Sequence, residues 1–451
     1  MKENKMGTKN IKSLVIGMSL PMIASMLVQA LYNVVDSYFV SKIGEDAFAA
    51  VSLAYPIQYL MSGLAVGTAV GINALLSRSL GEKNFEQANQ SAENGLLLGI
   101  FHYSLFLIFG LFFPRLFLKT QTDDPQIIEY GVQYISIVTI FSLGSFMQLT
   151  LERIFQSVGK TYYTMITQSC GMILNMILDP ILIFGYFGMP KLGVAGAAIA
   201  TVIAQAIATF LCIFLQYKLN DDIKISSLKP NFPIIKEIYR VGFPSFVLIA
   251  VTSLTIYIMN FILIGFSSTA VAALGAYFKI RSFIFLPIFA LNNVVVPVIA
   301  YNYGAGYKDR AKETIDFSIK FATLIMMIGF FALQVFPEEL LKIFNASDEL
   351  LEIGVVALRM ISLVYLVAGH NLVASAVFQG LGNGVLSLNA SIIRQILALL
   401  PVAYLMSKTG NLNAVWLAYP ISEIADYIYC RHNLINFAYK KIDAIGEKEA
   451  I

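Results

Sequence analysis

The sequence is poor in the residues that disulfide scaffolds, metal sites and ATP-driven enzymes require. Its 451 residues include three cysteines and three histidines, which are scattered singly and show no metal-ligand spacing. No GxxxxGK[ST] loop is present, and neither an HExxH motif nor a plausible Ser, His and Asp set can be found. We therefore expect neither an enzyme nor a bound metal or cofactor.

Charged residues are also scarce. They make up 13% of the chain, against roughly a quarter in a soluble domain, while hydrophobic residues make up 57%. The apolar residues divide into stretches of the ~20 residues that cross a bilayer. The pattern predicts an all-α polytopic membrane protein with twelve transmembrane helices, over residues 12–41, 48–78, 89–117, 127–157, 160–187, 190–218, 236–265, 269–302, 309–337, 350–380, 383–408 and 410–437.

The few basic residues lie mostly on one side of the predicted bundle. Of the 31 Lys and Arg residues, 21 fall on the side that holds both termini and 6 on the other. This asymmetry predicts cytoplasmic termini in a bacterial cytoplasmic membrane. The basic residues are topology signals, so we expect contact with the lipid bilayer and none with nucleic acid.

The chain also reads as one unit written twice, 223 residues apart. Pro21 pairs with Pro244, and Phe155-Gln156-x-x-Gly159 returns as Phe378-Gln379-x-x-Gly382. Six spans per half give a parallel repeat around a central cleft. The pattern predicts an N-lobe over 1–222 and a C-lobe over 223–451, joined by a cytoplasmic linker at 219–235.

The first span carries one polar stripe. Gln29, Tyr32, Asn33 and Asp36 have the spacing i, i+3, i+4, i+7, which places them on one helical face. A polar face that ends in a carboxylate lines water or a partner rather than lipid. The alternative is a solvated Asp36 at the outer interface.

The fifth span carries Asn175 and Asp179, again on one face, followed by Pro180. Proline removes a backbone donor and frees carbonyl oxygens, so the segment offers several of the oxygen ligands that hard cations use. Together with Asp36, this carboxylate predicts a site for a proton or a small cation. The alternative is a capping or packing role at a kink.

These elements, with the Gly193-x-Ala195-Gly196-Ala197-Ala198 run and the Glu152-x-x-x-Gln156-x-x-Gly159 helix end, resemble the multidrug and toxic compound extrusion (MATE) family. The resemblance covers essentially the whole chain. It implies a cation-coupled antiporter with two lobes.

The resemblance also implies roles for individual residues. It puts the N-lobe cation site on Asp36, Asn175, Asp179 and Thr201, and makes Pro21 the position at which the first helix bends. The surrounding polar network is expected to comprise Gln29, Tyr32, Asn33, Tyr134 and Glu152.

The C-lobe departs from some members of that family. Its seventh span has no acid, and its tenth carries His370 and Asn371 instead. These two residues, with Lys279 and Arg281, are candidates for the lining of a cleft in the C-lobe. The intramembrane charges of this half either form ion pairs between spans or select anionic substrates; the others are Arg359, Arg394, Glu423 and Asp426.

The sequence as a whole predicts a monomeric multidrug antiporter. Entry of H⁺ or Na⁺ would drive the export of amphipathic, cationic organic compounds by alternating access. An alternative is a flippase or exporter of lipid-linked or anionic substrates of the same superfamily.

Overall fold

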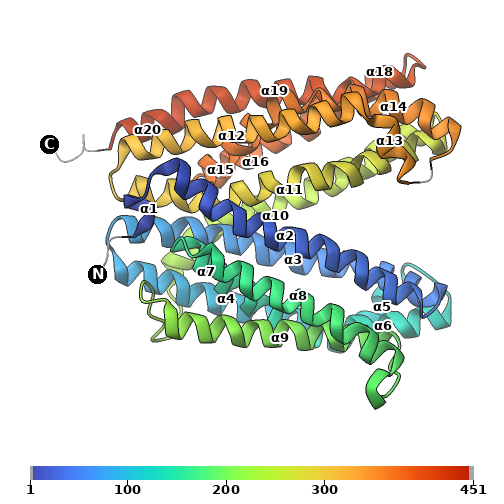
Figure 1. Ribbon diagram of the computed structural model, residues 1–451, viewed down its shortest axis with the longest axis horizontal. Coiled ribbons are helices and arrows are strands. Elements are labelled where there is room, and N and C mark those ends of the chain that lie inside the picture. Colours follow the sequence, from blue (N-terminus) through green and yellow to red (C-terminus); the bar gives the residue numbers. More distant parts are fainter. Residues whose placement is uncertain (1–3, 345, 446–451) are drawn as a thin grey trace. The chain divides into compact units, whose positions relative to one another are not determined.

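The structure is a computed structural model that describes residues 4–344 and 346–445. Its elements are helices, with no strand in those residues (Figure 1). Nine helices of the described chain are long and apolar enough to cross a membrane, and two bent helix pairs could add two more spans. The predicted fold class, an all-α multi-pass membrane protein, is confirmed.

The chain forms two compact units. One is Leu20–Gly242, and the other combines Met1–Ser19 with Phe243–Ile451. The units follow packing, whereas the predicted lobes, 1–222 and 223–451, follow the sequence repeat. The lobe division stays a prediction.

The boundaries between the units fall inside two helices. Both α2 (Ile11–Ser41) and α10 (Phe232–Ile264) therefore contribute to both units. Each crossing lies just before a proline in the helix interior, Pro21 in α2 and Pro244 in α10.

Between these two crossings the chain forms the helices of the first unit. They are α3 (Glu45–Gly81), α4 (Phe85–Phe112), α5 (Pro114–Lys119), α6 (Pro125–Ile140), α7 (Leu143–Ser157), α8 (Thr161–Phe184) and α9 (Val194–Leu219). The short η1 (Tyr186–Gly188) joins α8 to α9.

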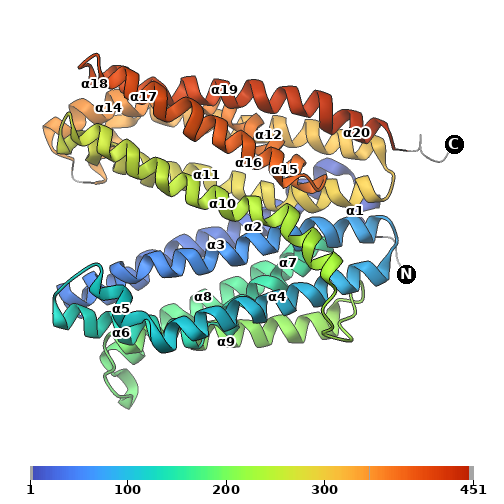
Figure 2. The same cartoon turned by 180° about the vertical axis from the view of Figure 1, so that it is seen from behind.

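The second unit contains α1 (Lys5–Thr8) and the helices that follow α10. They are α11 (Ser268–Gly304), α12 (Lys308–Val335), α13 (Pro337–Lys342), α14 (Asp348–Ser362), α15 (Tyr365–Gly380), α16 (Gly384–Ile392), the π-helix η2 (Ile393–Leu399), α17 (Leu400–Ser407), α18 (Leu412–Trp416), α19 (Ala418–Asn433), the π-helix η3 (Leu434–Tyr439) and α20 (Lys440–Asp443). Figure 2 shows this half from behind, with α16, α17 and α19 in view. The run from α18 to α20 covers the twelfth predicted span.

The repeat is visible in the elements themselves. Helices α3 and α11 both have 37 residues, α4 and α12 both have 28, and α5 and α13 both have 6. The glycines that follow α7 and α15 share a left-handed backbone, with φ of 82° at Gly159 and 79° at Gly382. Glycine adopts this conformation without steric cost, which explains why both copies carry it.

Two predicted spans are broken rather than continuous. Residues 127–157 form α6 and α7 at an angle of 47°, and residues 350–380 form α14 and α15 at 52°. Neither break has a proline. Instead, hydroxyl side chains bond to backbone carbonyls of the preceding turn, Ser142 to Thr139 at 2.8 Å and Ser362 to Arg359 at 2.9 Å. Such bonds compete with the helical ladder and favour a bend.

The linker at 219–235 is held firmly against the first unit. Glu93 Oε1 on α4 accepts hydrogen bonds from Ser226 N at 2.8 Å, Ser226 Oγ at 3.1 Å and Ser227 N at 2.8 Å. Lys160 forms an ion pair with Asp222 at 2.9 Å. These contacts fix the linker in place against the first unit.

Small residues bring α8 and α9 together next to the predicted cation site. A Cβ atom at Gly196 would collide with the backbone carbonyl of Leu182, so this position requires glycine. Close approach through small residues is a common way for transmembrane helices to pack. Thr201 lies little more than one turn after Gly196 and so comes within reach of Asn175 on α8.

Candidate functional site

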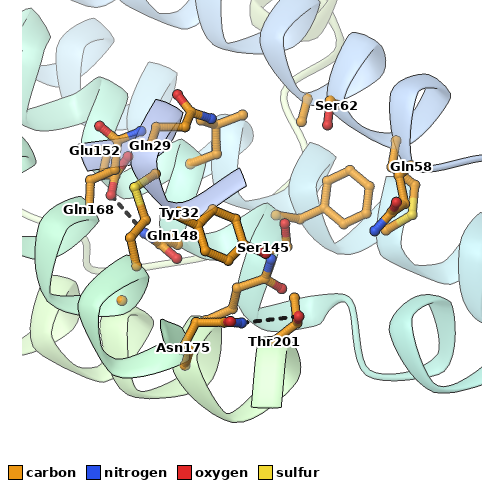
Figure 3. Close-up of a pocket in the computed structure, with 18 of the residues that line it drawn as sticks. Gln29, Tyr32, Gln58, Ser62, Ser145, Gln148, Glu152, Gln168, Asn175 and Thr201 are labelled. Carbon is orange, nitrogen blue, oxygen red and sulfur yellow. Dashed lines mark hydrogen bonds between the residues drawn. The ribbon is translucent and has the colours of Figure 1, made fainter. Parts of the chain in front are cut away.

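A cavity of about 290 Å³ lies within the bundle of the first unit. Side chains from α2, α3, α6, α7, α8 and α9 line it, and Figure 3 shows most of the polar ones. The polar lining consists of Gln29, Tyr32, Gln58, Ser62, Ser145, Gln148, Glu152, Gln168, Asn175, Thr201 and Gln205.

One wall of the cavity is a hydrogen-bonded network between α8 and α9. The Asn175 amide lies 3.0 Å from Thr201 Oγ1 (Figure 3). With its nitrogen turned toward Asp179, Asn175 donates to both carboxylate oxygens, at 2.8 and 3.1 Å, and its oxygen accepts from Thr201. All three residues are buried. The structure thus brings together three of the four residues assigned to the cation site.

The fourth, Asp36, belongs to the same network through its charge. It is half-buried on α2, and its carboxylate interacts electrostatically with Asp179. Tyr32, one turn earlier, interacts with both carboxylates and is within hydrogen-bonding reach of Thr201. Neither Asp36 nor Asp179 lines the cavity, whereas Tyr32 and Asn175 do. The carboxylates therefore lie one side chain away from the cavity.

The polar stripe on α2 only partly faces the cavity. The exposed Gln29 and the half-buried Tyr32 line it, whereas the exposed Asn33 is not part of the lining. The opposite face of α2 is apolar and largely exposed, with 63% of Leu31 and 64% of Val34 accessible. An apolar surface of this kind suits contact with lipid.

Glu152 forms a second buried network. Its Oε1 accepts from Gln148 Nε2 at 2.9 Å and from Thr167 Oγ1 at 3.1 Å. The next residue, Arg153, interacts with it electrostatically and donates to Gln156 at 2.8 Å. Glu152 is the one carboxylate among the cavity-lining residues.

Tyr134 is attached to the cavity through a neighbour. Its hydroxyl accepts from Gln58 Nε2 at 3.1 Å, and Gln58 lines the cavity. Tyr134 also interacts electrostatically with Asp36. It therefore connects the predicted cation network to the α3 side of the cavity.

Sequence reasoning missed several polar residues of the lining. They are Gln58, Ser62, Ser145, Gln148, Gln168 and Gln205. A signal for them was available in the spacing, because Ser145, Gln148 and Glu152 follow i, i+3, i+7 on α7. Gln168 and Asn175 follow i, i+7 on α8 in the same way. Spacing of the same kind singled out the polar face of α2 in the sequence.

In the second unit, the buried charges form an ion-paired cluster. Arg394 on η2 lies 3.5 Å from Glu423 and 3.8 Å from Asp426, both on α19. Asn371 Nδ2 donates to Glu423 Oε1 at 2.9 Å, and the His370 ring packs on Tyr427 with centroids 4.7 Å apart. His370 and Asn371 are thus engaged in packing and in the support of this cluster.

The two basic residues predicted on the eighth span contact aromatic rings. Lys279 Nζ lies 5.7 Å from the centre of the Phe344 ring, and the Arg281 guanidinium lies 4.4 Å from that of Phe285. These are cation–π contacts. A role of either residue in lining a cleft stays a prediction.

Comparison with known proteins identifies both halves of the chain. A family model described as MatE matches residues 21–181 and 244–405, two segments with the spacing of the internal repeat. The chain is 26% identical to an FAD transporter of Shewanella oneidensis over 435 residues, which covers 93% of each chain. It is 25% identical to the multidrug export protein MepA of Staphylococcus saprophyticus, covering 88% of this chain and 87% of that one.

Solved structures share the fold. A MATE protein crystallised in the bent conformation superposes with a TM-score of 0.90 at 23% identity over 100% of both chains. The outward-facing conformation of a multidrug resistance MATE family transporter superposes with a TM-score of 0.88 at 24% identity over 99% of both chains.

Proposed function

Because the chain belongs to the MatE family of efflux transporters, we propose that it is a cation-coupled antiporter that uses entry of H⁺ or Na⁺ to export organic compounds. Members of this family are transporters rather than enzymes. Two features carry the finer proposal: the network that supplies an ion site, and the cavity beside it that can take a substrate.

The single observation that supports coupling is the position of Asp179. It is fully buried, receives hydrogen bonds from the Asn175 amide, and interacts with the charge of Asp36. Two carboxylates inside an apolar bundle are costly unless a cation or a proton offsets their charge. The network therefore favours binding of H⁺ or Na⁺ at Asp36, Asn175, Asp179 and Thr201.

Coupling requires that the ion and the substrate influence each other's binding. Tyr32 and Asn175 provide the connection, since each lines the cavity and interacts with a carboxylate of the network. A change of charge at Asp36 or Asp179 would reorient these two side chains. Substrate affinity would then change with ion occupancy, as antiport by alternating access demands.

The substrates that we propose are amphipathic organic molecules. The curated relatives include an FAD transporter and multidrug export proteins, so small organic compounds are common to both. Glu152 in the cavity wall favours cationic members of this class. An exporter of anionic or lipid-linked substrates has less support, because Arg394 is paired with two carboxylates.

We also propose a cytoplasmic-membrane location with both termini in the cytoplasm. The uneven distribution of Lys and Arg supports this orientation. In this proposal the protein works as a monomer, because one chain supplies both lobes, and it needs no cofactor beyond the transported ion.

The test is export of ethidium from energised cells or from inverted vesicles under separately imposed proton and sodium gradients. Wild type, Asp36→Asn and the control Asp221→Asn would be compared. Asp221 is an exposed acid of the linker, so its substitution leaves the bundle unchanged. We expect export that follows one gradient, survives in Asp221→Asn, and is lost in Asp36→Asn.

Two results would contradict the proposal. Export by Asp36→Asn at the wild-type rate would remove coupling from this network. Export that ignores both gradients would remove cation-coupled antiport altogether.

A further inference from the structure

Amide side chains dominate the polar wall of the cavity. Five glutamines line it from five helices: Gln29 on α2, Gln58 on α3, Gln148 on α7, Gln168 on α8 and Gln205 on α9. Four of them are labelled in Figure 3. Polar side chains inside membrane spans usually line a water-filled or ligand-filled space. Five amides around one cavity therefore point to a ligand with hydrogen-bonding groups of its own.

The amides differ in whether the protein already uses them. Gln58 donates to Tyr134 and Gln148 donates to Glu152. Across residues 4–344 and 346–445, no hydrogen bond engages the side-chain amides of Gln29, Gln168 and Gln205. Each amide offers two donors and one carbonyl acceptor. The three therefore present donors and acceptors together to whatever fills the cavity.

Charge is a weaker feature of this wall than hydrogen bonding. Glu152 is the one carboxylate of the lining, and both Gln148 and Thr167 bond to the same oxygen of it. Arg153 lies beside it and offsets its charge. The amides outnumber this single, partly balanced charge, so hydrogen bonding contributes to recognition in the cavity beside the preference for cations that Glu152 gives.

The size and the remaining walls of the cavity suit a ring system. A cavity of ~150 Å³ holds one benzene molecule. The observed volume of about 290 Å³ is roughly twice as large and therefore has room for about two fused rings. Tyr32 and Phe146 line the cavity as well, and aromatic side chains offer flat apolar surfaces to the faces of a planar ligand.

We infer that the cavity binds a planar heteroaromatic ring whose edge carries adjacent N–H donors and carbonyl acceptors, recognised by the glutamine amides. Pyrimidinedione and oxopurine rings share this chemistry, and the pyrimidinedione end of the isoalloxazine ring system has it too. Gln29, Gln168 and Gln205 are then the specificity-determining residues of the cavity. The inference deepens the proposed function, since it names the substrate class of the same cavity.

Riboflavin is a suitable probe, because it is uncharged, fluorescent and carries such an edge. Its binding to the purified full-length protein in detergent would be followed by fluorescence quenching, for wild type, Gln168→Met and Gln205→Met. Methionine keeps the length of glutamine and removes the amide. We expect each substitution to weaken binding by roughly threefold to tenfold, the value of about one hydrogen bond.

The matched control is Gln126→Met, an exposed glutamine at the start of α6 that does not line the cavity. It should bind riboflavin as wild type does. The two test residues lie on different helices, so one remains informative if the other variant does not fold. Thermal unfolding of each variant identifies such a failure.

Two outcomes would overturn the inference and leave antiport intact. They are an absence of riboflavin binding alongside gradient-driven ethidium export, and wild-type riboflavin affinity in either folded test variant. The reverse result separates the two ideas as well. Riboflavin binding that depends on Gln168 and Gln205, without gradient-driven export of any dye, would support the inference and remove the proposed coupling.

Discussion

At the scale of single residues, Thr201 tests whether the Asn175 amide must be held in place. Thr201→Val keeps the shape of the side chain and removes the hydroxyl that lies 3.0 Å from that amide. We expect gradient-driven export to fall by roughly threefold to tenfold, because one buried hydrogen bond is worth about 1 kcal/mol. The measurement is initial export rate against the imposed gradient.

Thr209→Val provides the control on the same helix. Thr209 is also buried, but its hydroxyl donates to the Gly144 and Gln205 carbonyls and not to the proposed cation site. A loss of export as large in Thr209→Val as in Thr201→Val would mean that the effect arises from packing of α9.

The second residue-scale prediction concerns the ion-paired cluster around Arg394. Arg394→Met leaves Glu423 and Asp426 buried with no guanidinium, which should lower the free energy of unfolding by about 3–5 kcal/mol. Adding Glu423→Gln and Asp426→Asn removes the unbalanced charge and should restore most of the loss. Thermal unfolding in detergent measures both effects. A single variant as stable as wild type would show that the cluster contributes little.

Residue patterns predicted part of the site and missed the rest for a physical reason. Asp36 and Asp179 were recognisable because a carboxylate in an apolar span is costly and therefore informative, and Asn175 because it lies one helical turn before Asp179. Gln168 and Gln205 were missed because an uncharged amide gives a weaker signal. Arg394, Glu423 and Asp426 were recognised as charges, but their pairing required the distances between helices.

At the scale of elements, the nine continuous spans of the described residues could be predicted from apolar length, and the bends in the two broken spans could not. The bend between α6 and α7 has no proline to announce it. Ser142 bonds to the preceding turn there, but Ser104 and Ser282 make the same kind of bond inside the unbroken helices α4 and α11. Packing of the surrounding helices decides between the two results.

The hydrogen bonds that hold the linker against α4 can be tested by proteolysis. Glu93→Ala removes the carboxylate that accepts three hydrogen bonds from Ser226 and Ser227. The linker should then open more often, and trypsin should cleave after the exposed Lys224 on the order of tenfold faster.

Glu86→Ala is the control for this prediction. Glu86 lies on the same helix, is exposed, and accepts a hydrogen bond only from Gln90 among its described neighbours. Equal cleavage rates in the two variants would show that Glu93 does not hold the linker in place.

At the scale of the whole molecule, the two copies of the repeat allow a comparison of backbone strain at equivalent positions. Lys83 has a left-handed backbone with φ of 57°, and the equivalent position in the second half is Gly306, with φ of 76°. A residue with a side chain pays about 1 kcal/mol there that glycine does not. Lys83→Gly should therefore raise the unfolding temperature, and Gly306→Lys should lower it. A lower unfolding temperature for Lys83→Gly would contradict this reading of the repeat.

The stretches of chain that form each unit have a consequence for the order in which the protein folds during synthesis. Residues 20–242 contain one whole unit, so that unit can assemble as soon as its last helix leaves the ribosome. The N-terminal segment is synthesised first, yet it packs with residues that emerge after position 242. The segment therefore lacks its packing partners until more than half of the protein has been translated. Splitting the gene at the linker would then yield two fragments that each lack part of a unit and must associate to complete it.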